Sequence, residues 1–444
     1  MIKQKYYLIK TYGCQMNVHE SEKLAGVLNL FGYIETSEQL SADIVVFNTC
    51  CIRDGAEQKL YAHIGALKSL KKNNPNLIIC VCGCASQAEG RAEIIKKKFP
   101  FVDIIIGTHN LHVFQEYLES FIENKKYICD VWENEREINE NYNALRTSGA
   151  NAWVNISYGC NNFCSYCIVP FVRGKERSRK MEDIINEVKN LIKEGYKYIT
   201  LLGQNVNSYG NDIDDKNITF AKLLEKCAKL DGNFKLKFMT SHPKDLTEDV
   251  IKTIATNDKI CKVIHLPVQS GSNKILKLMN RKYTKEHYLS LIKNIRNHIP
   301  DCYISTDIIV GFPCENEEDF METYNLIKEV QYDGVFAFMY SKRSGTVADK
   351  MEEQVSNEIK RKRVNELLKL SKSITKQKNS ELIGKVINAL VDSYDKEKKG
   401  YNTFTDSGKS IFVPSDKNII SIHSFHKVEV KRMINNKLIG EFLN

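Results

Sequence analysis

Short apolar runs alternate with helical patterns over the first part of the chain. Three runs, "KYYLIKTYGC", "ADIVVFNTC" and "NLIICVCGC", are rich in Ile, Val, Leu or Tyr, and each ends in a cysteine. Between them, "SEKLAGVLNLFG" and "GAEQKLYAHIGALKSLKK" place apolar residues at helical spacing. Strands that alternate with helices are typical of a parallel sheet, so we predict an open α/β domain over residues 1–121.

The cysteines that end these three runs are Cys14, Cys50 and Cys84. Consecutive strands of such a sheet point the same way, so their carboxyl ends share one edge. Open α/β sheets place their ligands at that edge. We therefore expect the three side chains to meet there although they are distant in sequence.

The rest of the chain changes pattern twice. Residues 122–145 are polar and charged, which predicts a linker. Strand-like runs then recur in "AWVNISYGC", "YKYITLLGQNVN", "FKLKFMTSHP", "CKVIHLPVQSGS", "CYISTDIIVGFP" and "DGVFAFMYS", with helical stretches between most of them. About six β/α units predict a partial (β/α)6 barrel over residues 146–377, with its site at the carboxyl ends of the strands. Short strand candidates over residues 378–444 predict a small all-β barrel, a type that often binds nucleic acid.

Composition indicates a cytoplasmic protein without a membrane segment. The chain has 444 residues, of which 42% are hydrophobic and 27% charged, as in soluble globular proteins. No run approaches the ~18 apolar residues of a membrane span, and the start lacks the apolar segment of a signal peptide. In the cytosol, 14 cysteines are expected as metal ligands or free thiols rather than disulfides.

Basic residues concentrate in two segments. The formal net charge of +9 is consistent with an anionic partner such as nucleic acid. "RGKERSRK" (173–180) follows a loop with three cysteines, and "KRKRVNELLKLSKSITKQK" (360–378) predicts a basic helix. A solvated charged face is the alternative interpretation of each segment.

The loop "YGCNNFCSYCIVP" carries Cys160, Cys164 and Cys167 with the spacing C-x3-C-x2-C. A cubane [4Fe–4S] cluster has four irons, and each needs one external ligand, so three thiolates leave one iron open. The amino and carboxylate groups of S-adenosylmethionine suit that open position. One electron from the cluster then breaks the sulfonium–C5′ bond and gives a 5′-deoxyadenosyl radical. A zinc knuckle with a distant fourth ligand is the alternative.

With Tyr166 before its last cysteine, the loop resembles the signature of the radical S-adenosylmethionine superfamily. "TYGCQMN", "NTCCIRDGAEQK" and "GCASQ" resemble the N-terminal domain of the methylthiotransferases. "LLGQNVNSYG", "TSHP", "HLPVQSGS", "MNRKYT" and "STDIIVGFP" resemble their radical core, and the tail is similar to the TRAM domain, an OB-like RNA-binding barrel. The branch that makes 2-methylthio-N6-dimethylallyladenosine at position 37 of tRNA fits these motifs best.

The resemblance implies two [4Fe–4S] clusters and S-adenosylmethionine as cofactors. The radical cluster would be bound by Cys160, Cys164 and Cys167, and an auxiliary cluster, also with an open iron, by Cys14, Cys50 and Cys84. One S-adenosylmethionine would donate a methyl group to sulfur held on the auxiliary cluster, and another would be cleaved at the radical cluster. No side chain would act as a general acid or base.

The resemblance also implies contacts and partners. S-adenosylmethionine or the base would contact Tyr166 in the cysteine loop and residues at predicted strand ends, namely Gly203, Gln204, Asn205, Gln269, Ser270 and Asp307. The tRNA would be held by Arg173, Arg177, Arg179, Lys360, Arg361 and Arg363. We expect a monomer that binds the anticodon stem-loop and depends on an electron donor of the flavodoxin or ferredoxin type and on a sulfur donor. His242 and His265 border the same edge and are interpreted as bonded polar residues rather than ligands.

The other cysteines are interpreted as small buried or free thiols. This set comprises Cys51, Cys80, Cys82, Cys129, Cys227, Cys261 and Cys302; a zinc site at Cys80, Cys82 and Cys84 is the alternative and lacks a fourth ligand. Cys314 stands where the family usually has glycine, so that turn is expected either to crowd a side chain or to require an unfavourable φ, and to tolerate the cysteine.

Two alternative functions are considered. A methylthiotransferase could act on threonylcarbamoyladenosine in tRNA or on a ribosomal protein. From another class, an iron–sulfur protein could bind RNA or transfer electrons without catalysis.

Overall fold

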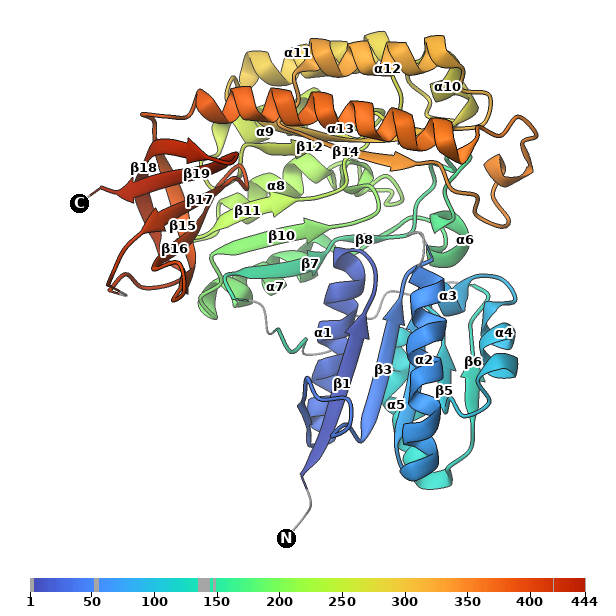
Figure 1. The fold of residues 1–444 in the computed structure, drawn as a ribbon. Coiled ribbons are helices and arrows are strands. Elements are labelled where there is room, and N and C mark those ends of the chain that lie inside the picture. Colours follow the sequence, from blue (N-terminus) through green and yellow to red (C-terminus); the bar gives the residue numbers. More distant parts are fainter. Residues whose placement is uncertain (1–3, 52–55, 135–143, 147–148, 418, 444) are drawn as a thin grey trace. The chain divides into compact units, whose positions relative to one another are not determined.

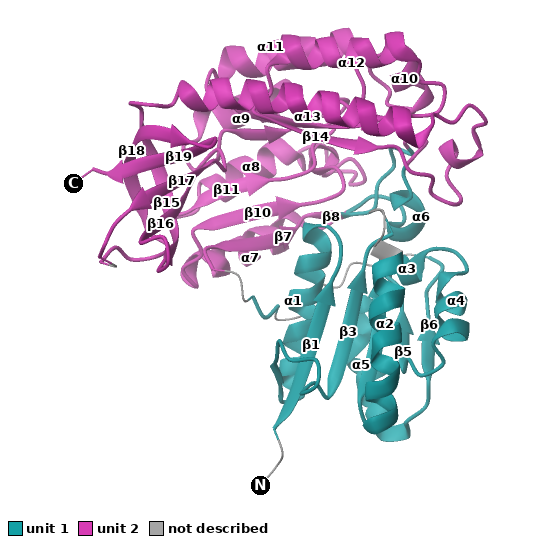
Figure 2. Cartoon of the chain, viewed as in Figure 1, with its two compact units in different colours: residues 1–147, 158–163, 167–177 teal, residues 148–157, 164–166, 178–444 magenta. Residues whose placement is uncertain are grey.

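The computed structural model describes residues 4–51, 56–134, 144–146, 149–417 and 419–443. The chain divides into two compact units (Figure 2). Unit 1 comprises residues 1–147, 158–163 and 167–177, and unit 2 comprises residues 148–157, 164–166 and 178–444. Among the described residues, no helix has the length and apolar character needed to cross a bilayer.

Unit 1 contains a six-stranded sheet in the order β2-β1-β3-β4-β5-β6, and every pair of neighbouring strands is parallel. The strands are β1 (Lys5–Thr11), β2 (Tyr33–Glu35), β3 (Ile44–Thr49), β4 (Ile78–Gly83), β5 (Ile104–Ile106) and β6 (Ile128–Asp130). The helices are α1 (Gln15–Leu30), α2 (Ala56–Asn73), α3 (Cys84–Gln87), α4 (Arg91–Lys98), η1 (Leu111–Val113), α5 (Phe114–Asn124) and α6 (Val169–Arg173).

Helices cover both faces of this sheet (Figure 1). Val46 and Cys80 pack with residues of α1 and α5, whereas Val45 and Ile79, one position earlier on the same strands, pack with residues of α2 and α4. Successive strand residues point to opposite faces, so a strand covered on both faces is apolar throughout. All six residues of β3 and all six of β4 are buried.

The prediction of an open parallel α/β domain is confirmed, and its limits differ from the expected ones. Residues Ile128–Asp130, inside the predicted linker 122–145, form the edge strand β6. Three-residue strands such as β2, β5 and β6 are too short to give a periodic signal. Residues 135–143 of the predicted linker lie outside the described residues.

Unit 2 begins with a partial parallel barrel made of two three-stranded sheets, β11-β10-β7 and β12-β13-β14. The bridge between Leu236 and Ile260 links them. The strands are β7 (Asn151–Asn155), β10 (Tyr198–Leu202), β11 (Lys235–Phe238), β12 (Val263–His265), β13 (Tyr303–Val310) and β14 (Gly334–Met339). The short strands β8 (Ser157–Tyr158) and β9 (Arg177–Ser178) pair separately. Six parallel strands in barrel order confirm the predicted partial (β/α)6 architecture.

Helices follow each barrel strand and enclose one apolar core. They are α7 (Met181–Lys193), η2 (Val206–Ser208), α8 (Phe220–Ala228), α9 (Glu248–Thr256), α10 (Asn273–Leu278), α11 (Lys285–His298), α12 (Glu317–Val330), η3 (Ala348–Lys350) and α13 (Asn357–Ser380). Several of these helices begin at a Thr, Ser or Asn whose side chain accepts a backbone N–H, and Asn316 and Asp319 form a full capping box.

The chain ends in a closed five-stranded barrel, β15-β16-β17-β19-β18, as the turn-separated strand pattern predicts. Its strands are β15 (Val386–Asp395), β16 (Gly400–Thr405), β17 (Ser410–Pro414), β18 (Phe425–Ile434) and β19 (Lys437–Phe442). A small core that includes Val391, Tyr401, Ile411 and Val428 fills it. Lys235 on β11 pairs with Asp406 of this barrel at 2.6 Å, so the two parts of unit 2 are joined by direct contacts.

Candidate functional site

The cysteines of the first triad lie at the carboxyl ends of three adjacent strands of unit 1. Cys14 precedes α1 and follows β1 by three residues, Cys50 directly follows β3, and Cys84 directly follows β4. The last residues of β3 and β4, Thr49 and Gly83, are register partners. All three cysteines therefore follow adjacent parallel strands at one edge of the sheet, as the strand order predicts, and their role as a ligand set stays a prediction.

Two glycines allow the loops of this edge to approach one another. A Cβ on Gly13 would lie 2.6 Å from Asn17 Oδ1 and 3.0 Å from Cys50 Cβ. Gly83 has φ +96°, and a Cβ there would lie 2.5 Å from the Thr49 carbonyl oxygen. A side chain at Gly83 would therefore require the backbone to shift, and one at Gly13 would displace the side chains of Asn17 and Cys50.

Two buried asparagines fix the backbone beneath the first triad. Asn17 Nδ2 donates to Asn48 Oδ1 at 3.0 Å, and Asn48 Nδ2 donates to the Asn17 carbonyl at 2.8 Å. The thiol of Cys14 lies 3.2 Å from Asn17 Oδ1. These bonds connect the end of β3 to the first turn of α1 and hold Cys14 in place.

Arg173, from α6, is buried beside the first triad. Its guanidinium donates to Glu20 at 2.7 and 3.2 Å, a bidentate ion pair. The pKa of the Cys84 thiol falls to about 7, because a hydrogen bond with Cys51 and the positive charge of Arg173 outweigh the effect of burial. Thiolate is the form of cysteine that binds metal, so this site favours the ligand form.

Cys51 is the partner in that hydrogen bond, which raises its own pKa, as does burial. Cys80 and Cys82 lie inside β4 with less than 2% of their surface exposed, and burial raises the pKa of both. These thiols stay protonated in the core, which agrees with their interpretation as buried cysteines. The contact between Cys51 and Cys84 was missed because no sequence spacing indicates it.

The second triad comes from one loop, and backbone bonds anchor that loop in each unit. In unit 1, the Cys160 N–H donates to the Gly174 carbonyl at 3.2 Å. In unit 2, Ser165 donates from its N–H to the Met279 carbonyl at 3.1 Å and from its Oγ to the Leu278 carbonyl at 2.8 Å. The Ser165 carbonyl accepts the Ala348 N–H at 2.8 Å.

Arg281 contacts the second triad within unit 2. It is 4% exposed, and its Nη1 donates to Cys164 Sγ at 3.2 Å. Tyr166, named as a cofactor contact, lies 3.5 Å from the same nitrogen through its hydroxyl, and its ring packs edge-on against Phe312 at 6.4 Å between centroids. The "MNRKYT" motif supplied Arg281, but nothing in its spacing indicated a contact with cysteine.

Several buried polar atoms at the carboxyl end of the barrel have no hydrogen-bond partner among the described residues. They include Ser157 Oγ, Asn205 Oδ1, Asn207 Nδ2, Ser241 Oγ, His242 Nε2 and Gln269 Oε1. Buried polar groups are normally bonded, so a group of unbonded ones at a strand edge indicates that a polar ligand completes them. S-adenosylmethionine, which carries an amino, a carboxylate and two ribose hydroxyl groups, fits this donor and acceptor set.

The sequence-predicted cofactor contacts divide into two groups. Gly203, Gln204 and Asn205 follow β10 as expected, and a Cβ on Gly203 would lie 2.6 Å from Ser157 Oγ. Gln269 is held at φ +70° with its amide oxygen buried.

The remaining predicted contacts already have partners in the protein. Ser270 Oγ accepts the Ser272 N–H at 3.2 Å and lies 3.3 Å from Thr323 Oγ1, so its role in the structure is to support a turn. Asp307, on β13, pairs with His265 Nε2 at 3.5 Å.

His242 departs from the interpretation of a fully bonded histidine. The Lys244 N–H donates to its Nδ1 at 3.2 Å. Burial first, and then the charges of Arg281 and Lys244, lower the pKa of His242 to about 2. The ring is therefore neutral with its proton on Nε2, a buried donor that the described residues leave unbonded.

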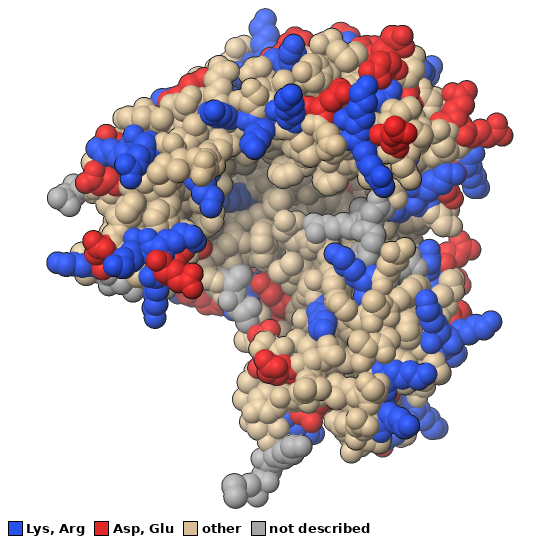
Figure 3. All heavy atoms as spheres, viewed as in Figure 1, with Lys and Arg blue, Asp and Glu red and all other residues tan. Residues whose placement is uncertain are grey.

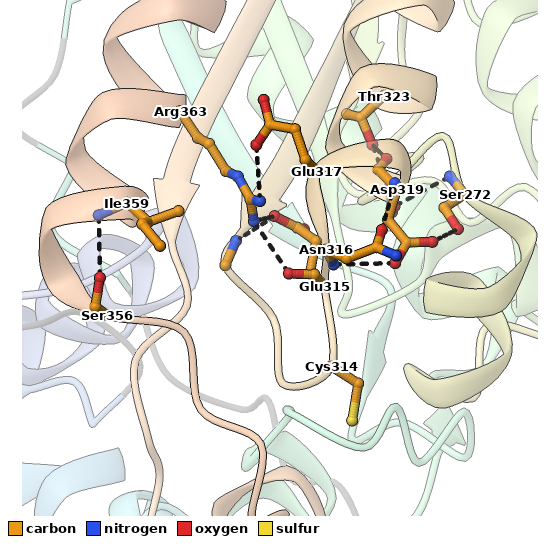
Figure 4. Close-up of polar contacts among 12 residues, drawn as sticks. Ser272, Cys314, Glu315, Asn316, Glu317, Asp319, Thr323, Ser356, Ile359 and Arg363 are labelled. Atoms are coloured by element: carbon orange, nitrogen blue, oxygen red, sulfur yellow. Dashed lines mark hydrogen bonds and ion pairs between the residues drawn. The ribbon is translucent and has the colours of Figure 1, made fainter.

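Four of the six residues predicted to contact RNA are buried and paired. Arg173 is bound to Glu20 as described, and Arg179 donates to Glu187 at 2.8 Å and to the Asn155 carbonyl at 2.6 Å. Lys360 donates to the Tyr340 carbonyl at 3.1 Å. Arg363 donates to Glu315 at 2.6 Å and to Glu317 at 3.1 Å (Figure 4). The phosphate interpretation is wrong for these four in this structure, because their charged groups face carboxylates and carbonyls inside the protein.

Arg177 is half-buried and Arg361 is exposed on α13. The exposed face of α13 also presents Lys362, Lys369, Lys372 and Lys376. Figure 3 shows Lys and Arg side chains on unit 2 with carboxylates between them. The basic helix expected from the sequence therefore exists, with partly different residues on its surface.

The turn that carries Cys314 confirms the backbone concern raised by the sequence (Figure 4). Cys314 has φ +67°, its N–H donates to the Glu353 carbonyl at 2.9 Å, and its carbonyl accepts from Lys274 Nζ at 2.8 Å. The side chain is half-buried rather than crowded. A cysteine here is therefore unfavourable because of its positive φ and not because of steric crowding of its side chain.

Comparison with known proteins gives matches to two family models and to long relatives. The Radical SAM superfamily matches residues 154–327, and a family described as uncharacterized protein family UPF0004 matches residues 6–107. A tRNA-2-methylthio-N(6)-dimethylallyladenosine synthase of Clostridium botulinum (strain Okra / Type B1) is 52% identical over 98% of this chain and 96% of its own length. Proteins of the same name from Clostridium tetani and Thermoanaerobacter pseudethanolicus are 51% and 50% identical, over 98% and 94% of this chain and over 96% and 89% of their own lengths.

Solved structures share the fold at low identity. The radical S-adenosylmethionine methyltransferase TsrM from Kitasatospora setae, solved with cobalamin and a [4Fe-4S] cluster, superposes with a TM-score of 0.56 at 12% identity, covering 78% of this chain and 74% of its own. The cobalamin-dependent radical enzyme OxsB gives 0.53 at 15% identity, over 84% of this chain and 56% of its own.

Proposed function

The chain belongs to the tRNA-2-methylthio-N(6)-dimethylallyladenosine synthase family, and we propose that it adds a methylthio group to C2 of N6-dimethylallyladenosine at position 37 of tRNA. The observation that carries this proposal is the identity of about half the residues over nearly the whole length of relatives with that name. It is a transferase of a sulfur-containing group that uses radical S-adenosylmethionine chemistry.

The two triads hold separate [4Fe–4S] clusters, with Cys14, Cys50 and Cys84 at one and Cys160, Cys164 and Cys167 at the other. When bound, the clusters and S-adenosylmethionine supply the radical and the methylthio group. Two observations support this assignment: Arg173 favours the thiolate of Cys84 at the sheet edge, and Arg281 donates to Cys164 in the loop.

Other residues of the chain bind and orient S-adenosylmethionine. Asn205, Ser241, His242 and Gln269 present buried polar atoms to S-adenosylmethionine at the end of the barrel. The neutral His242 holds its proton on Nε2, where a carboxylate or hydroxyl oxygen can accept it. C2 of the base carries a hydrogen that no side-chain base removes, so the protein's task is positioning.

The exposed basic face of α13 and the C-terminal barrel, which we interpret as a TRAM domain, bind the anticodon stem-loop. Reading a base of that loop requires it to leave its stack and enter a pocket. We place the domain limits at 1–121, 146–377 and 378–444, with the addition of β6 to the first domain. We further propose a cytoplasmic monomer that receives electrons from a flavodoxin- or ferredoxin-type donor and sulfur from a separate donor.

Nucleoside analysis tests the reaction. In a strain without the gene, mass spectrometry of tRNA nucleosides should show dimethylallyladenosine without its methylthio group. Loss of the methylthio group from threonylcarbamoyladenosine, or from a ribosomal protein, would instead identify one of the other substrates. Reconstituted protein that forms no 5′-deoxyadenosine with dithionite and S-adenosylmethionine, although both clusters are intact, would indicate a non-catalytic iron–sulfur protein.

Salt dependence tests the RNA surface. Arg361→Ala and Lys369→Ala should each weaken tRNA binding and reduce the slope of log affinity against log salt by about 1, because each removes a phosphate contact and its released counterion. Lys97→Ala, at an exposed position on α4, is the matched control and should leave the slope unchanged. Equal slopes for all three variants would contradict this surface.

A further inference from the structure

Arg281 stands in an unusual backbone setting between α10 and α11. Its neighbours Asn280 and Lys282 have φ values of +57° and +59°, in the left-handed region that costs energy for residues other than glycine. The Arg281 N–H donates to the Leu276 carbonyl at 3.0 Å. This turn directs the side chain inward, where 4% of the residue remains exposed.

The guanidinium of Arg281 is largely bonded to the protein. Nη1 donates to Cys164 Sγ at 3.2 Å, Nη2 to the Pro267 carbonyl at 2.9 Å and Nε to Tyr283 Oη at 2.9 Å. None of these partners is a carboxylate. The carbonyl and the phenol are neutral, so Cys164 is the bonded group that can carry a negative charge as a metal-bound thiolate.

A buried charge without a counter-charge is strongly unfavourable. Among the groups bonded to Arg281, the thiolate of Cys164 is therefore the one that balances the positive charge of the guanidinium, together with whatever metal group that thiolate binds. Arg281 thus donates a hydrogen bond to the sulfur of a predicted cluster ligand. Hydrogen bonds to ligand sulfurs are one of the features that set the reduction potential of an iron–sulfur cluster.

A buried arginine also lies beside the first triad, but its charge is balanced by a carboxylate. Arg173 affects the Cys84 thiol, but its charge is matched by the bidentate bond to Glu20. Side chains of both Arg173 and Glu20 are at most 6% exposed, so the pair remains in the low-dielectric interior. The arginine at the first triad is thus neutralised by a carboxylate, and the arginine at the second triad is not.

We propose that Arg281 raises the reduction potential of the cluster held by Cys160, Cys164 and Cys167, and thereby directs the incoming electron to it. The Arg173–Glu20 pair gives the cluster at Cys14, Cys50 and Cys84 no such net positive charge. The step is a one-electron transfer from a low-potential donor to a cluster, in which no bond forms or breaks. The proposal rests on the proposed function for the presence of the two clusters.

The test measures potentials one cluster at a time in the full chain. A protein with Cys14→Ala, Cys50→Ala and Cys84→Ala retains only the second triad, and a redox titration followed by electron paramagnetic resonance gives its potential. Arg281→Met in this protein should lower the ratio of reduced to oxidised cluster at a fixed potential by about tenfold, which is about 59 mV for one electron. Arg281→Lys keeps the charge and should retain most of the ratio.

The reciprocal measurement uses Cys160→Ala, Cys164→Ala and Cys167→Ala, which leaves only the first triad. Glu20→Gln removes the carboxylate charge beside Arg173 at nearly constant shape. It should raise the reduced-to-oxidised ratio of this cluster, opposite in sign to the effect of Arg281→Met. All potentials are read per bound cluster, and Arg281→Gln, a neutral donor, replaces Arg281→Met where iron content falls.

The possible outcomes test the role of Arg281 and the proposed function separately. An unchanged potential in Arg281→Met and Arg281→Gln at full iron content overturns the inference. Weaker binding of S-adenosylmethionine with an unchanged potential also overturns it and makes Arg281 a ligand of the substrate carboxylate. Absence of iron from the protein that retains only the second triad, before any change at Arg281, contradicts the proposed function instead.

Discussion

Cys14, Cys50 and Cys84 come from three strands of one sheet, whereas Cys160, Cys164 and Cys167 come from eight consecutive residues. The first set requires β1, β3 and β4 to be correctly folded and paired before the cysteines meet. The second set is brought together by a single loop, in which Cys164 accepts a hydrogen bond from Arg281 within unit 2. The first site is thus a product of tertiary structure, and the second is largely local.

The two triads also differ in the charges that lie beside them. Unit 1 places a complete ion pair, Arg173–Glu20, beside its cysteines, and unit 2 places Arg281 alone beside Cys164. A site that stores and transfers a group needs stable ligands, while a site that accepts an electron benefits from a positive charge. Two triads of the same residue type thus differ in the charge beside them, and under the proposed function this difference would suit them to different tasks.

The largest expected effect separates the two triads by activity. Cys164→Ala should abolish 5′-deoxyadenosine formation and methylthio transfer together, because the radical originates at its cluster. Cys14→Ala should leave most deoxyadenosine formation and abolish methylthio transfer. Both products are measured by mass spectrometry, with Cys129→Ala on β6 as the control that retains both. Equal loss of both products in Cys14→Ala would contradict separate tasks.

Glu20→Ala breaks the buried pair of unit 1. It should lower the free energy of unfolding of this unit by about 3–5 kcal/mol, because Arg173 is left buried without a counter-charge. The chain has two tryptophans, Trp132 in unit 1 and Trp153 in unit 2, so Trp153→Phe leaves fluorescence that reports on unit 1.

An exposed hydrogen bond of unit 1, from Gln115 to Glu119 on α5, provides the control for this measurement. Glu119→Ala should leave the free energy of unfolding of this unit nearly unchanged, as is usual for surface substitutions. A loss in Glu20→Ala no larger than this would show that the pair does not support the first triad.

Ser241→Ala removes an unbonded buried hydroxyl from unit 2. It should weaken binding of S-adenosylmethionine by about two- to tenfold, the value of one hydrogen bond, without loss of stability. Ser272→Ala removes a hydroxyl that is bonded to Asp319 and caps α10, so it should lower stability and leave affinity unchanged. The reverse pattern in calorimetry and thermal unfolding would place the cofactor elsewhere.

The smallest effect concerns the strained turn of unit 2. Cys314→Gly should raise the free energy of unfolding by about 1 kcal/mol, because glycine adopts φ +67° without the steric cost of a Cβ. Cys314→Ala retains the Cβ and should give no gain. Equal stability of all three proteins in denaturant titrations would show that the turn stores no strain.

Sequence patterns predicted the parts of this protein that depend on local periodicity. Alternation of strands and helices was sufficient to place Cys14, Cys50 and Cys84 at one edge, since parallel strands end together. It missed β6, because three residues carry no period and the surrounding charges resemble a linker. It also placed Arg173 and Arg363 on the surface, because a charged residue is usually exposed and its buried partner, Glu20 or Glu315, lies far away in sequence.

The account depends on one open iron at each triad. The most direct measurement is electron paramagnetic resonance of the reduced protein that retains only Cys160, Cys164 and Cys167, with and without S-adenosylmethionine labelled at its amino nitrogen. A changed signal with hyperfine coupling to the label is expected, because the three thiolates leave one iron to bind the cofactor. A signal that ignores the cofactor, from a cluster with four protein ligands, would contradict the account.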